Sequence, residues 1–443
     1  MRWRLSFVPV AWLASLLLGG GRAAGEPDPK SPAVVKLHGL LRGAVLRLEP
    51  YFRFEPKEEA RFGVLGTAVG TTREFEELRL EVGADRSVVP AALRAGFEAY
   101  RIKREVARGE PQQADVKADV AVVRLKNPFR DSVYVSAVRA VGRTVVFVRG
   151  ECAKKDEAAL VRVAKATAAG VTLEGDAPDA WLPAEVKATW NRTPGADVVL
   201  VDDGTLDEAA KAAIGKGVRD AYAVVRKLVP GAPTMPGPAV VRVTKNRDLF
   251  SYVSGRRDVR ALDALYLPWA AELLVCPRKD VVDGPQLAAE AASMAVHHLL
   301  GCADAQPVLE GLRRMAAAAA AGVPAGAFTP ADEAAAFARV KAHEAETWNR
   351  LMMRNTFANF LGEDADVRGI DAELAVGYLL SPGAAVGKAS FAAWVTAMRK
   401  SGHPDAGSEG AVGAMDGAKS DAEYWAYWGP KADPPKKPGK GGK

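Results

Sequence analysis

The chain has 443 residues, a formal net charge of +6 and three cysteines. This length predicts two or three domains, and so few scattered cysteines exclude a disulfide framework. The positive charge lies at the ends, because the first 25 residues contain three arginines and no acid, while residues 431–443 hold five lysines and one aspartate. The body between them is close to neutral, so we expect no binding to nucleic acid.

Residues 1–25 have the pattern of a secretory signal peptide. Arg2 and Arg4 precede an apolar run from Leu5 to Leu18, and small residues from Ala23 to Gly25 form a cleavage zone. The run is short for a membrane span, which needs about 20 apolar residues, although an uncleaved anchor is the alternative. No later segment has the length of a span. We therefore predict a secreted or periplasmic protein without a transmembrane segment after cleavage.

Residues 33–174 are predicted to form an N-terminal α+β domain. Three β-rich runs are separated by short turns, and the last two should pair as a hairpin: Val120–Leu125, Val133–Ala137 and Thr144–Val148. A helix is predicted from Glu157 to Ala169, with Asp156 as its N-cap. The domain contains no set of potential ligands, and we interpret it as a packing or adaptor module.

Residues 175–196 are rich in proline and glycine and are predicted to be a linker. The second domain, residues 197–430, starts with a strand at Val198 and later becomes dominated by helical patterns. Its helices are predicted over residues 285–300, 307–321, 331–361, 371–380 and 388–399. Residues 431–443 consist mainly of lysine, proline and glycine, so we expect a disordered tail.

The helix predicted over residues 285–300 has clear end signals. Asp283 can accept hydrogen bonds from the first-turn amides, and Gln286 completes the spacing of a capping box. Pro285 suits a first helical turn, and Gly301 should end the helix. The helix and the one after it therefore have well-defined faces on which candidate site residues can be placed.

These two helices have the outline of a zinc-peptidase site. In the His-Glu-x-x-His motif, two imidazoles one helical turn apart bind Zn²⁺, and the glutamate deprotonates the metal-bound water. Here the frame that ends at His297 has Ser293 in place of the first histidine and Met294 in place of the base, while Glu310 occupies the position of the third ligand. We therefore predict no catalytic residue and no metal cofactor, with His297 and Glu310 as vestigial metal ligands.

Two other zinc arrangements use His297 as the first ligand. With His298 as the base, the second ligand would fall on Gly301, which has no side chain. A set of His297, Cys302 and Glu310 has acceptable donor types but no recognised spacing. That set defines the alternative of an active metallopeptidase with atypical ligands.

Structural roles explain the same residues without a metal. His297 and His298 can be hydrogen-bonded core histidines, and Met294 can belong to the core. Glu310 has Arg313 and Arg314 three and four residues ahead, so an ion pair within the helix can satisfy it. The half-motif from His343 to Thr347 is interpreted as part of the solvated face of a long helix.

The order of features resembles the gluzincin class of zinc peptidases, in particular the peptidase-MA-like domains of secreted bacterial proteins. The matching features are a strand and helix at 197–203 and 206–228, a strand at 239–243, an Arg-Asp-x-Phe turn at 247–250 and a closing helix at 421–428. The resemblance covers residues 195–430. It implies an α+β fold, in which the N-terminal α+β domain is followed by a mainly helical zincin-like domain with a small mixed sheet.

In the resembling family, an edge strand precedes the motif helix and binds peptides by strand addition. The corresponding residues here are Glu272, Leu273, Leu274, Val275 and Cys276. The resemblance would bring Cys276 near Cys302, where we expect two buried thiols more readily than a disulfide.

The sequence therefore predicts an exported, non-catalytic pseudopeptidase with a peptide- or protein-binding or scaffold role in the cell envelope. The alternatives are the active zinc metallopeptidase described above and a purely structural envelope protein. Neither the partner nor the oligomeric state follows from the sequence.

Overall fold

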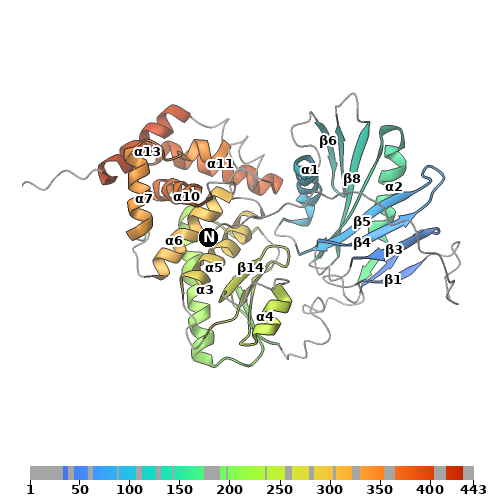
Figure 1. The fold of residues 1–443 in the computed structure, drawn as a ribbon, viewed down its shortest axis with the longest axis horizontal. Coiled ribbons are helices and arrows are strands. Elements are labelled where there is room, and N and C mark those ends of the chain that lie inside the picture. Colours follow the sequence, from blue (N-terminus) through green and yellow to red (C-terminus); the bar gives the residue numbers. More distant parts are fainter. Residues whose placement is uncertain are drawn as a thin grey trace, which may run out of the picture.

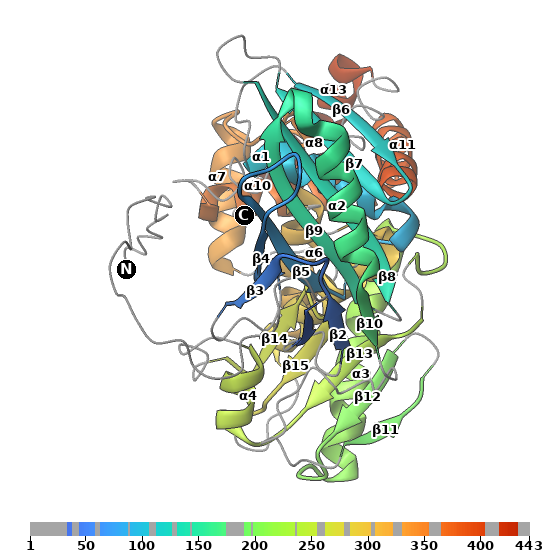
Figure 2. The ribbon, with the colours of Figure 1, turned by 90° about the vertical axis from the view of Figure 1, so that its right-hand side faces the viewer.

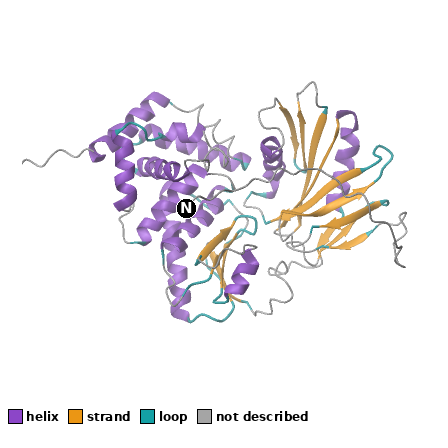
Figure 3. Cartoon of the chain, in the orientation of Figure 1, coloured by secondary structure: helices purple, strands orange, loops and turns teal. Residues whose placement is uncertain are grey.

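The computed structural model describes residues 33–37, 44–57, 63–86, 89–105, 112–125, 131–141, 144–173, 190–195, 198–234, 237–254, 262–278, 284–302, 306–321, 330–353, 365–403 and 416–432. The predicted signal peptide and most of the predicted linker and tail lie outside these ranges. Within them the fold is α+β, with a sheet-rich N-terminal part and a helical C-terminal part that contains a small mixed sheet (Figures 1 and 3). The predicted fold class is confirmed.

The N-terminal part is built on a seven-stranded antiparallel sheet with the order β3-β4-β5-β9-β8-β7-β6. Its strands are β3 Phe52–Pro56, β4 Gly63–Gly70, β5 Leu78–Asp85, β6 Gln112–Lys117, β7 Val120–Leu125, β8 Ser132–Val141 and β9 Thr144–Ala153. A three-stranded sheet, β1-β2-β10, lies beside it, with β1 Val34–Lys36, β2 Ala44–Arg47 and β10 Val171–Leu173. The predicted hairpin is confirmed, because β8 and β9 pair antiparallel over their full length.

Two helices, α1 Arg94–Glu105 and α2 Glu157–Ala169, cover opposite faces of the large sheet. Successive side chains of β7 point to opposite faces of the sheet. Val120 and Val122 share a core with α2, while Ala121 and Val123 share one with α1. Helix α2 lies across β8 and β9 (Figure 2). A 3₁₀ turn, η2 Ala91–Leu93, leads into α1.

Helix α2 has the predicted bounds and Asp156 occupies its N-cap position, but the predicted capping by the side chain is wrong. Asp156 belongs to a 3₁₀ turn, η3 Lys154–Asp156, and its side chain makes no capping hydrogen bond. Its backbone has φ −102° and ψ 4°, which differs from the extended conformation of a typical N-cap residue.

The C-terminal part contains a five-stranded mixed sheet with the order β11-β12-β13-β15-β14. Its strands are β11 Asn191–Thr193, β12 Val198–Asp202, β13 Ala239–Val243, β14 Ala264–Leu267 and β15 Glu272–Val275. Strands β12, β13 and β15 are parallel, whereas the two outer strands, β11 and β14, run antiparallel to their neighbours. Strand β11 falls inside the segment that was predicted to be a linker.

The helices of the C-terminal part are α3 Glu208–Leu228, α4 Arg247–Ser254, α5 Pro285–Leu300, α6 Gln306–Ala320, α7 Pro330–Lys341, α8 Trp348–Met353, α10 Ala365–Leu380, α11 Ala385–Ser401 and α13 Gly417–Ala432. Residues 247–250, predicted to be a turn, begin α4. The long helix predicted over residues 331–361 is interrupted after α7, where His343 has a left-handed φ of 57°. Among the described helices, none combines the length and apolar character that a membrane span requires.

Helix α5 has the predicted bounds, and Gly301 ends it in the left-handed conformation, with φ 64°. Gly284 occupies the N-cap position, and Asp283 lies outside the described residues. The predicted capping role of Gln286 is wrong, because its amide reaches strand β14 instead: its Oε1 accepts from the backbone nitrogen of Asp263 at 2.9 Å.

The small mixed sheet is a middle layer that separates two hydrophobic cores. Leu273 and Val275 on one face of β15 pack in the core formed by the C-terminal helices. Leu274 on the opposite face and Cys276 just beyond the strand pack in the core that contains the N-terminal sheet and α2. The two parts of the chain are therefore joined through this sheet.

A buried cluster of charges lies where the two parts meet. Glu272 at the start of β15 is 2% exposed, and its Oε2 accepts from Nε of Arg242 on β13 at 2.8 Å. Its Oε1 accepts from Nη1 of Arg86, just beyond β5, at 3.3 Å. The guanidinium of Arg242 also lies over the ring of Trp190, 4.5 Å from its centroid. One carboxylate thus connects the two sheets.

A second buried network lies beneath α1. Glu98 of α1 is fully buried and accepts from Nε of Arg149 on β9 at 2.8 Å, and its other oxygen lies 3.1 Å from Arg94. Burial alone would raise the pKa of Glu98, but Arg149, Arg94 and Arg101 outweigh it and lower the pKa to about 2. Burial instead raises the pKa of Asp85, which pairs with Arg94.

We predict that Glu272→Gln destabilises the protein by about 3 kcal/mol or more, because two buried guanidinium groups lose their counter-charge. Urea unfolding followed by circular dichroism would measure the change. The matched control is Glu77→Gln, which removes a carboxylate from an exposed pair with Arg79 and should cost no more than about 0.5 kcal/mol. Equal effects of the two substitutions would contradict the role assigned to Glu272.

The low pKa of Glu98 predicts loss of stability in acid. A folded pKa of about 2, below the ordinary 4.5, means that the unfolded chain binds the proton first as the pH falls. Between about pH 5 and about pH 3, the wild type should lose about 2 kcal/mol of unfolding free energy more than Glu98→Gln. The raised pKa of Asp85 acts in the opposite sense, and the charge of Glu98 contributes to raising it, so parallel urea titrations of the two proteins measure Glu98 together with its effect on Asp85. Identical pH dependence would contradict this account.

Candidate functional site

The positions of the lost zinc motif lie on α5 and are filled by internal contacts. The hydroxyl of Ser293 donates to the carbonyl oxygen of Ala289 at 3.2 Å, one turn back in the same helix. Met294 is 1% exposed and belongs to the core of the helical part. The structural reading of Met294 is confirmed, and neither residue presents a group that could bind a metal or take a proton from water.

The two histidines of α5 are buried, with different neighbours. The ring of His297 packs against Tyr266 of β14, with 5.2 Å between ring centroids. Nε2 of His298 lies 3.1 Å from the carbonyl oxygen of Gly237, and Nδ1 lies 3.0 Å from the hydroxyl of Tyr222. Since a carbonyl only accepts, Nε2 carries a proton and donates to Gly237, while the Tyr222 hydroxyl is the partner of Nδ1. The hydrogen-bonded core reading is confirmed for His298.

Glu310 of α6 is bound by arginines. Nε of Arg314 donates to its Oε1 at 3.0 Å, and Arg313 lies 3.9 Å from its Oε2, so the ion pairs predicted within this helix are confirmed. Arg313 also donates to Oε1 of Glu290 on α5 at 2.6 Å. The guanidinium of Arg313 thus lies between the carboxylates of Glu290 on α5 and Glu310 on α6.

The thiols do not complete a metal site. Cys276 and Cys302 are buried and form no disulfide. Burial raises the pKa of Cys276 to about 11, which keeps it protonated and unreactive. Within the described ranges, no three side chains of His, Cys, Asp or Glu form a group that could hold a metal ion. The donor set on α5 and α6 therefore does not fit the zinc that the resemblance implies.

The half-motif at His343 lies between two helices rather than on the long helix predicted. His343 lies after the end of α7, and its ring stacks on Trp425 of α13 with 4.8 Å between centroids. His343 and Thr347 consequently do not lie on one helix face. The predicted solvated setting is confirmed for His343 and Glu344, which are exposed, but the prediction of a long helix at these residues is wrong.

The predicted peptide-binding edge strand is also wrong. Residues Glu272, Leu273, Leu274 and Val275 form β15, which has β13 on one side and β14 on the other. Residues 264–267 fold back antiparallel on the outer side of β15, so β14 is the edge strand. Cys276, just beyond β15, is fully buried.

The outer side of β14 is closed by side chains of α5. Oε2 of Glu290 accepts from the backbone nitrogen of Tyr266 at 2.8 Å. Nε2 of Gln286 donates to the backbone oxygen of Ala264 at 3.3 Å. These two side chains occupy backbone groups that an added peptide strand would need. Strand addition at this edge would have to displace both of them.

We predict that Glu290→Ala destabilises the protein by about 2 kcal/mol, because the amide of Tyr266 loses its acceptor and Arg313 loses its partner. Glu290→Gln keeps an acceptor for the amide and should cost less. Hydrogen exchange provides the site-specific measurement: the Tyr266 amide should exchange faster in the alanine variant than in the glutamine variant. Unchanged protection in both would show that the edge is not closed by this residue.

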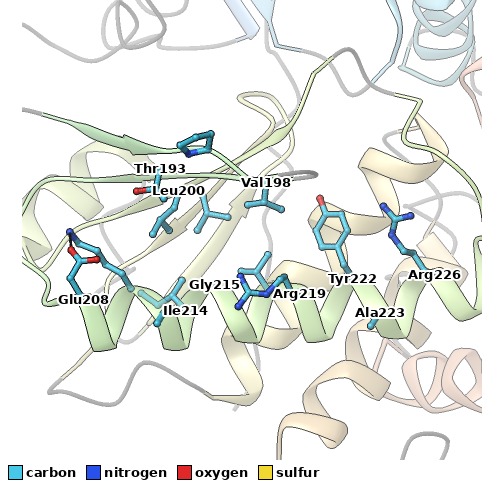
Figure 4. A pocket seen from close by; sticks show the side chains of 16 residues that line it. Thr193, Val198, Leu200, Glu208, Ile214, Gly215, Arg219, Tyr222, Ala223 and Arg226 are labelled. Atoms are coloured by element: carbon cyan, nitrogen blue, oxygen red, sulfur yellow. Dashed lines mark hydrogen bonds and ion pairs between the residues drawn. The ribbon is translucent and has the colours of Figure 1, made fainter.

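A cleft of about 440 Å³ lies on the other side of the helical part, between α3 and strands β11 and β12 (Figure 4). Its apolar lining consists of the half-buried Val198 and Leu200 of the sheet, above a floor of buried core side chains: Ile214, Val218, Tyr222 and Val241. Small residues on α3, Gly215 and Ala223, leave the space above the helix open. The volume is within the range of small-molecule and peptide sites, about 300–1,000 Å³.

The charged residues of the cleft differ in their partners. Lys211 lies 3.1 Å from Asp202 and 2.9 Å from Glu208, so its charge is compensated. Arg226 donates to the carbonyl oxygen of Gly231 at 3.4 Å. Among the residues that the structure describes, Arg219 has no acidic partner; it is exposed, and its Nη1 lies near Gly215. The Arg219 end of the cleft is therefore positive.

Sequence reasoning missed this cleft. The face of α3 that lines it reads as an ordinary amphipathic helix with charged positions. The available signal was the spacing of Lys211, Gly215, Arg219 and Ala223, in which small and cationic residues alternate every four positions along one face.

Comparison with known proteins adds little. No family model matches the chain, and no curated protein matches its sequence. Five chains of solved structures match, among them the solution structure of cyanobacterial PsbP (CyanoP) from Synechocystis sp. PCC 6803. That match has 12% sequence identity and a TM-score of 0.23, and it covers 35% of this chain and 98% of the other. At this TM-score it carries no argument about function.

Proposed function

We propose that this protein is an exported, non-catalytic pseudopeptidase that binds a peptide or protein in the cell envelope. One observation carries the proposal: Glu310, at the position of the third zinc ligand, accepts from Arg314 and lies 3.9 Å from Arg313, which also holds Glu290 on α5. The carboxylate that would bind the metal ion is thus paired with arginine side chains of the protein itself. Loss of the general base alone costs about 10²–10⁴ in rate, and loss of a ligand weakens metal binding further.

The arrangement of the helices supports gluzincin ancestry. Helix α5 lies against the antiparallel edge strand β14 through His297 and Tyr266, and α6 packs against α5. The resemblance calls for a motif helix beside an edge strand, with the helix of the distant glutamate next to it. The contacts differ from those of an enzyme, because each candidate group is engaged within the protein.

Binding is assigned to the cleft on α3. The ancestral peptide route along β14 is occupied by Gln286 and Glu290. The cleft, in contrast, is open and combines an apolar lining with an exposed arginine. The buried Glu272 cluster fixes the N-terminal part against the sheet behind the cleft, which suits a rigid scaffold.

The ancestry is tested by Ser293→His combined with Met294→Glu, which writes His-Glu-Ala-Val-His onto α5. The buried glutamate should lower the melting temperature without metal, because Met294 is in the core. Zinc should then raise it, since a ligand bound only by the folded state stabilises that state. Differential scanning fluorimetry with and without zinc measures the shift.

The matched control is Met294→Glu alone, which adds the same buried acid without the second imidazole and should not respond to zinc. If both variants fold and neither responds, the alignment of α5 with the peptidase motif is wrong. The wild type should retain less than about 0.1 equivalents of zinc after desalting, because too few ligands are present. Stoichiometric zinc that is lost in His297→Ala, or zinc-dependent peptide hydrolysis, would overturn the proposal of a pseudopeptidase.

A further inference from the structure

We propose that the cleft between α3 and strands β11 and β12 binds the free carboxyl end of an apolar peptide, with Arg219 holding the terminal carboxylate. This inference rests on the proposed binding function and specifies its ligand. Three features of the cleft carry it: the length of the apolar lining, the imbalance of charge, and the exposed backbone of an edge strand.

The cleft has the length of a short peptide segment. Its floor runs along α3 from Ile214 to Tyr222, which are buried, and Val198 and Leu200 of β12 line it as half-buried side chains (Figure 4). Eight residues of helix span about 12 Å, which equals about four residues of extended chain. Valine- and leucine-sized side chains of a ligand would cover the apolar surface that Val198 and Leu200 leave exposed, which is the main source of favourable free energy in such sites.

The charge of the cleft selects an anion. Lys211 is already neutralised by Asp202 and Glu208, so it adds little net charge at its end of the cleft. Arg219 has no acidic partner among the described residues, and Arg226 lies two helical turns further along the same side of α3. A guanidinium group binds a carboxylate with two parallel hydrogen bonds. A ligand with its carboxylate at Arg219 therefore complements the cleft.

The third feature favours a peptide over an acyl chain. Among the described strands β11 pairs with β12 alone, so one side of its backbone faces away from the sheet, and all its residues are exposed. Thr193, Pro194 and Gly195, at its end, line the cleft. Backbone carbonyls at this end of β11 can accept hydrogen bonds from the amides of a peptide, whereas a fatty acid has no amide to donate.

The experiment compares two probes by isothermal titration calorimetry at low salt: acetyl-Leu-Val-Leu-Val with a free carboxylate, and the same peptide as its C-terminal amide. The free acid should bind about tenfold more tightly, since a charge-assisted hydrogen bond is lost in the amide. Dodecanoate serves as the competing source of an apolar carboxylate. It should bind more weakly than the peptide acid, because it cannot use the backbone of β11.

Three variants assign binding to the cleft. Arg219→Gln should remove most of the preference for the acid, whereas Lys216→Gln, which removes a charge from the same helix outside this cleft, should leave it unchanged. Gly215→Leu should abolish binding of both peptides by filling the cleft. A Cβ at Gly215 would meet only the mobile end of Arg219, at 3.3 Å, so this variant should fold.

Equal binding of acid and amide, or a preference that persists in Arg219→Gln, would overturn the carboxylate assignment. Tighter binding of dodecanoate would overturn the peptide assignment, and absence of binding to the wild type at millimolar peptide would overturn the site. Each of these outcomes is independent of zinc. Failure here thus leaves the pseudopeptidase test on α5 unaffected, and zinc-dependent hydrolysis by the wild type would overturn the proposed function without reference to this cleft.

Discussion

The architecture depends on the carboxylate of Glu272. Two guanidinium groups, from Arg242 within the small sheet and Arg86 at the end of an N-terminal strand, are buried and converge on it. Burial of three charges is costly unless each is paired with good geometry, so the cluster tolerates few alternative arrangements. It therefore fixes how the N-terminal sheet approaches the C-terminal sheet. The candidate site and the cleft both depend on the sheet that this cluster orients, because their elements belong to it or pack on it: α3, α5 and β14.

Local signals explain which elements could be predicted. Pro285 and Gly301 mark the ends of α5, and the apolar run Val120–Leu125 coincides with β7, so the bounds of both elements follow from residues in or next to them. Strand β14 escaped prediction, because the run Ala264–Leu267 is short and has no polar alternation. Which strand lies at the edge depends on pairing between segments far apart in sequence. The assignment of residues 272–276 to the edge failed for that reason.

In the candidate site, too, contacts within one helix could be predicted from the sequence, whereas contacts between helices could not. The ion pair between Glu310 and Arg314 was predictable, since residues four apart on a helix are neighbours. The contact between Arg313 and Glu290 was not, because it joins different helices. The sequence shows Arg242 in the middle of one apolar run and Glu272 at the start of another, and charges at such positions need partners. No signal near either residue in the sequence indicated that the two would pair with each other.

The small sheet has one consequence for how the protein unfolds. Its two faces belong to two different cores, with Leu273 in one and Leu274 in the other. A cut in the segment between residues 174 and 189 would separate the chain into halves, but the C-terminal half would keep a sheet face that lacks its cover. The domain boundary predicted from the sequence therefore does not separate two units that unfold independently. Heat or denaturant should melt both halves in a single transition, and neither half is expected to be stable when produced alone.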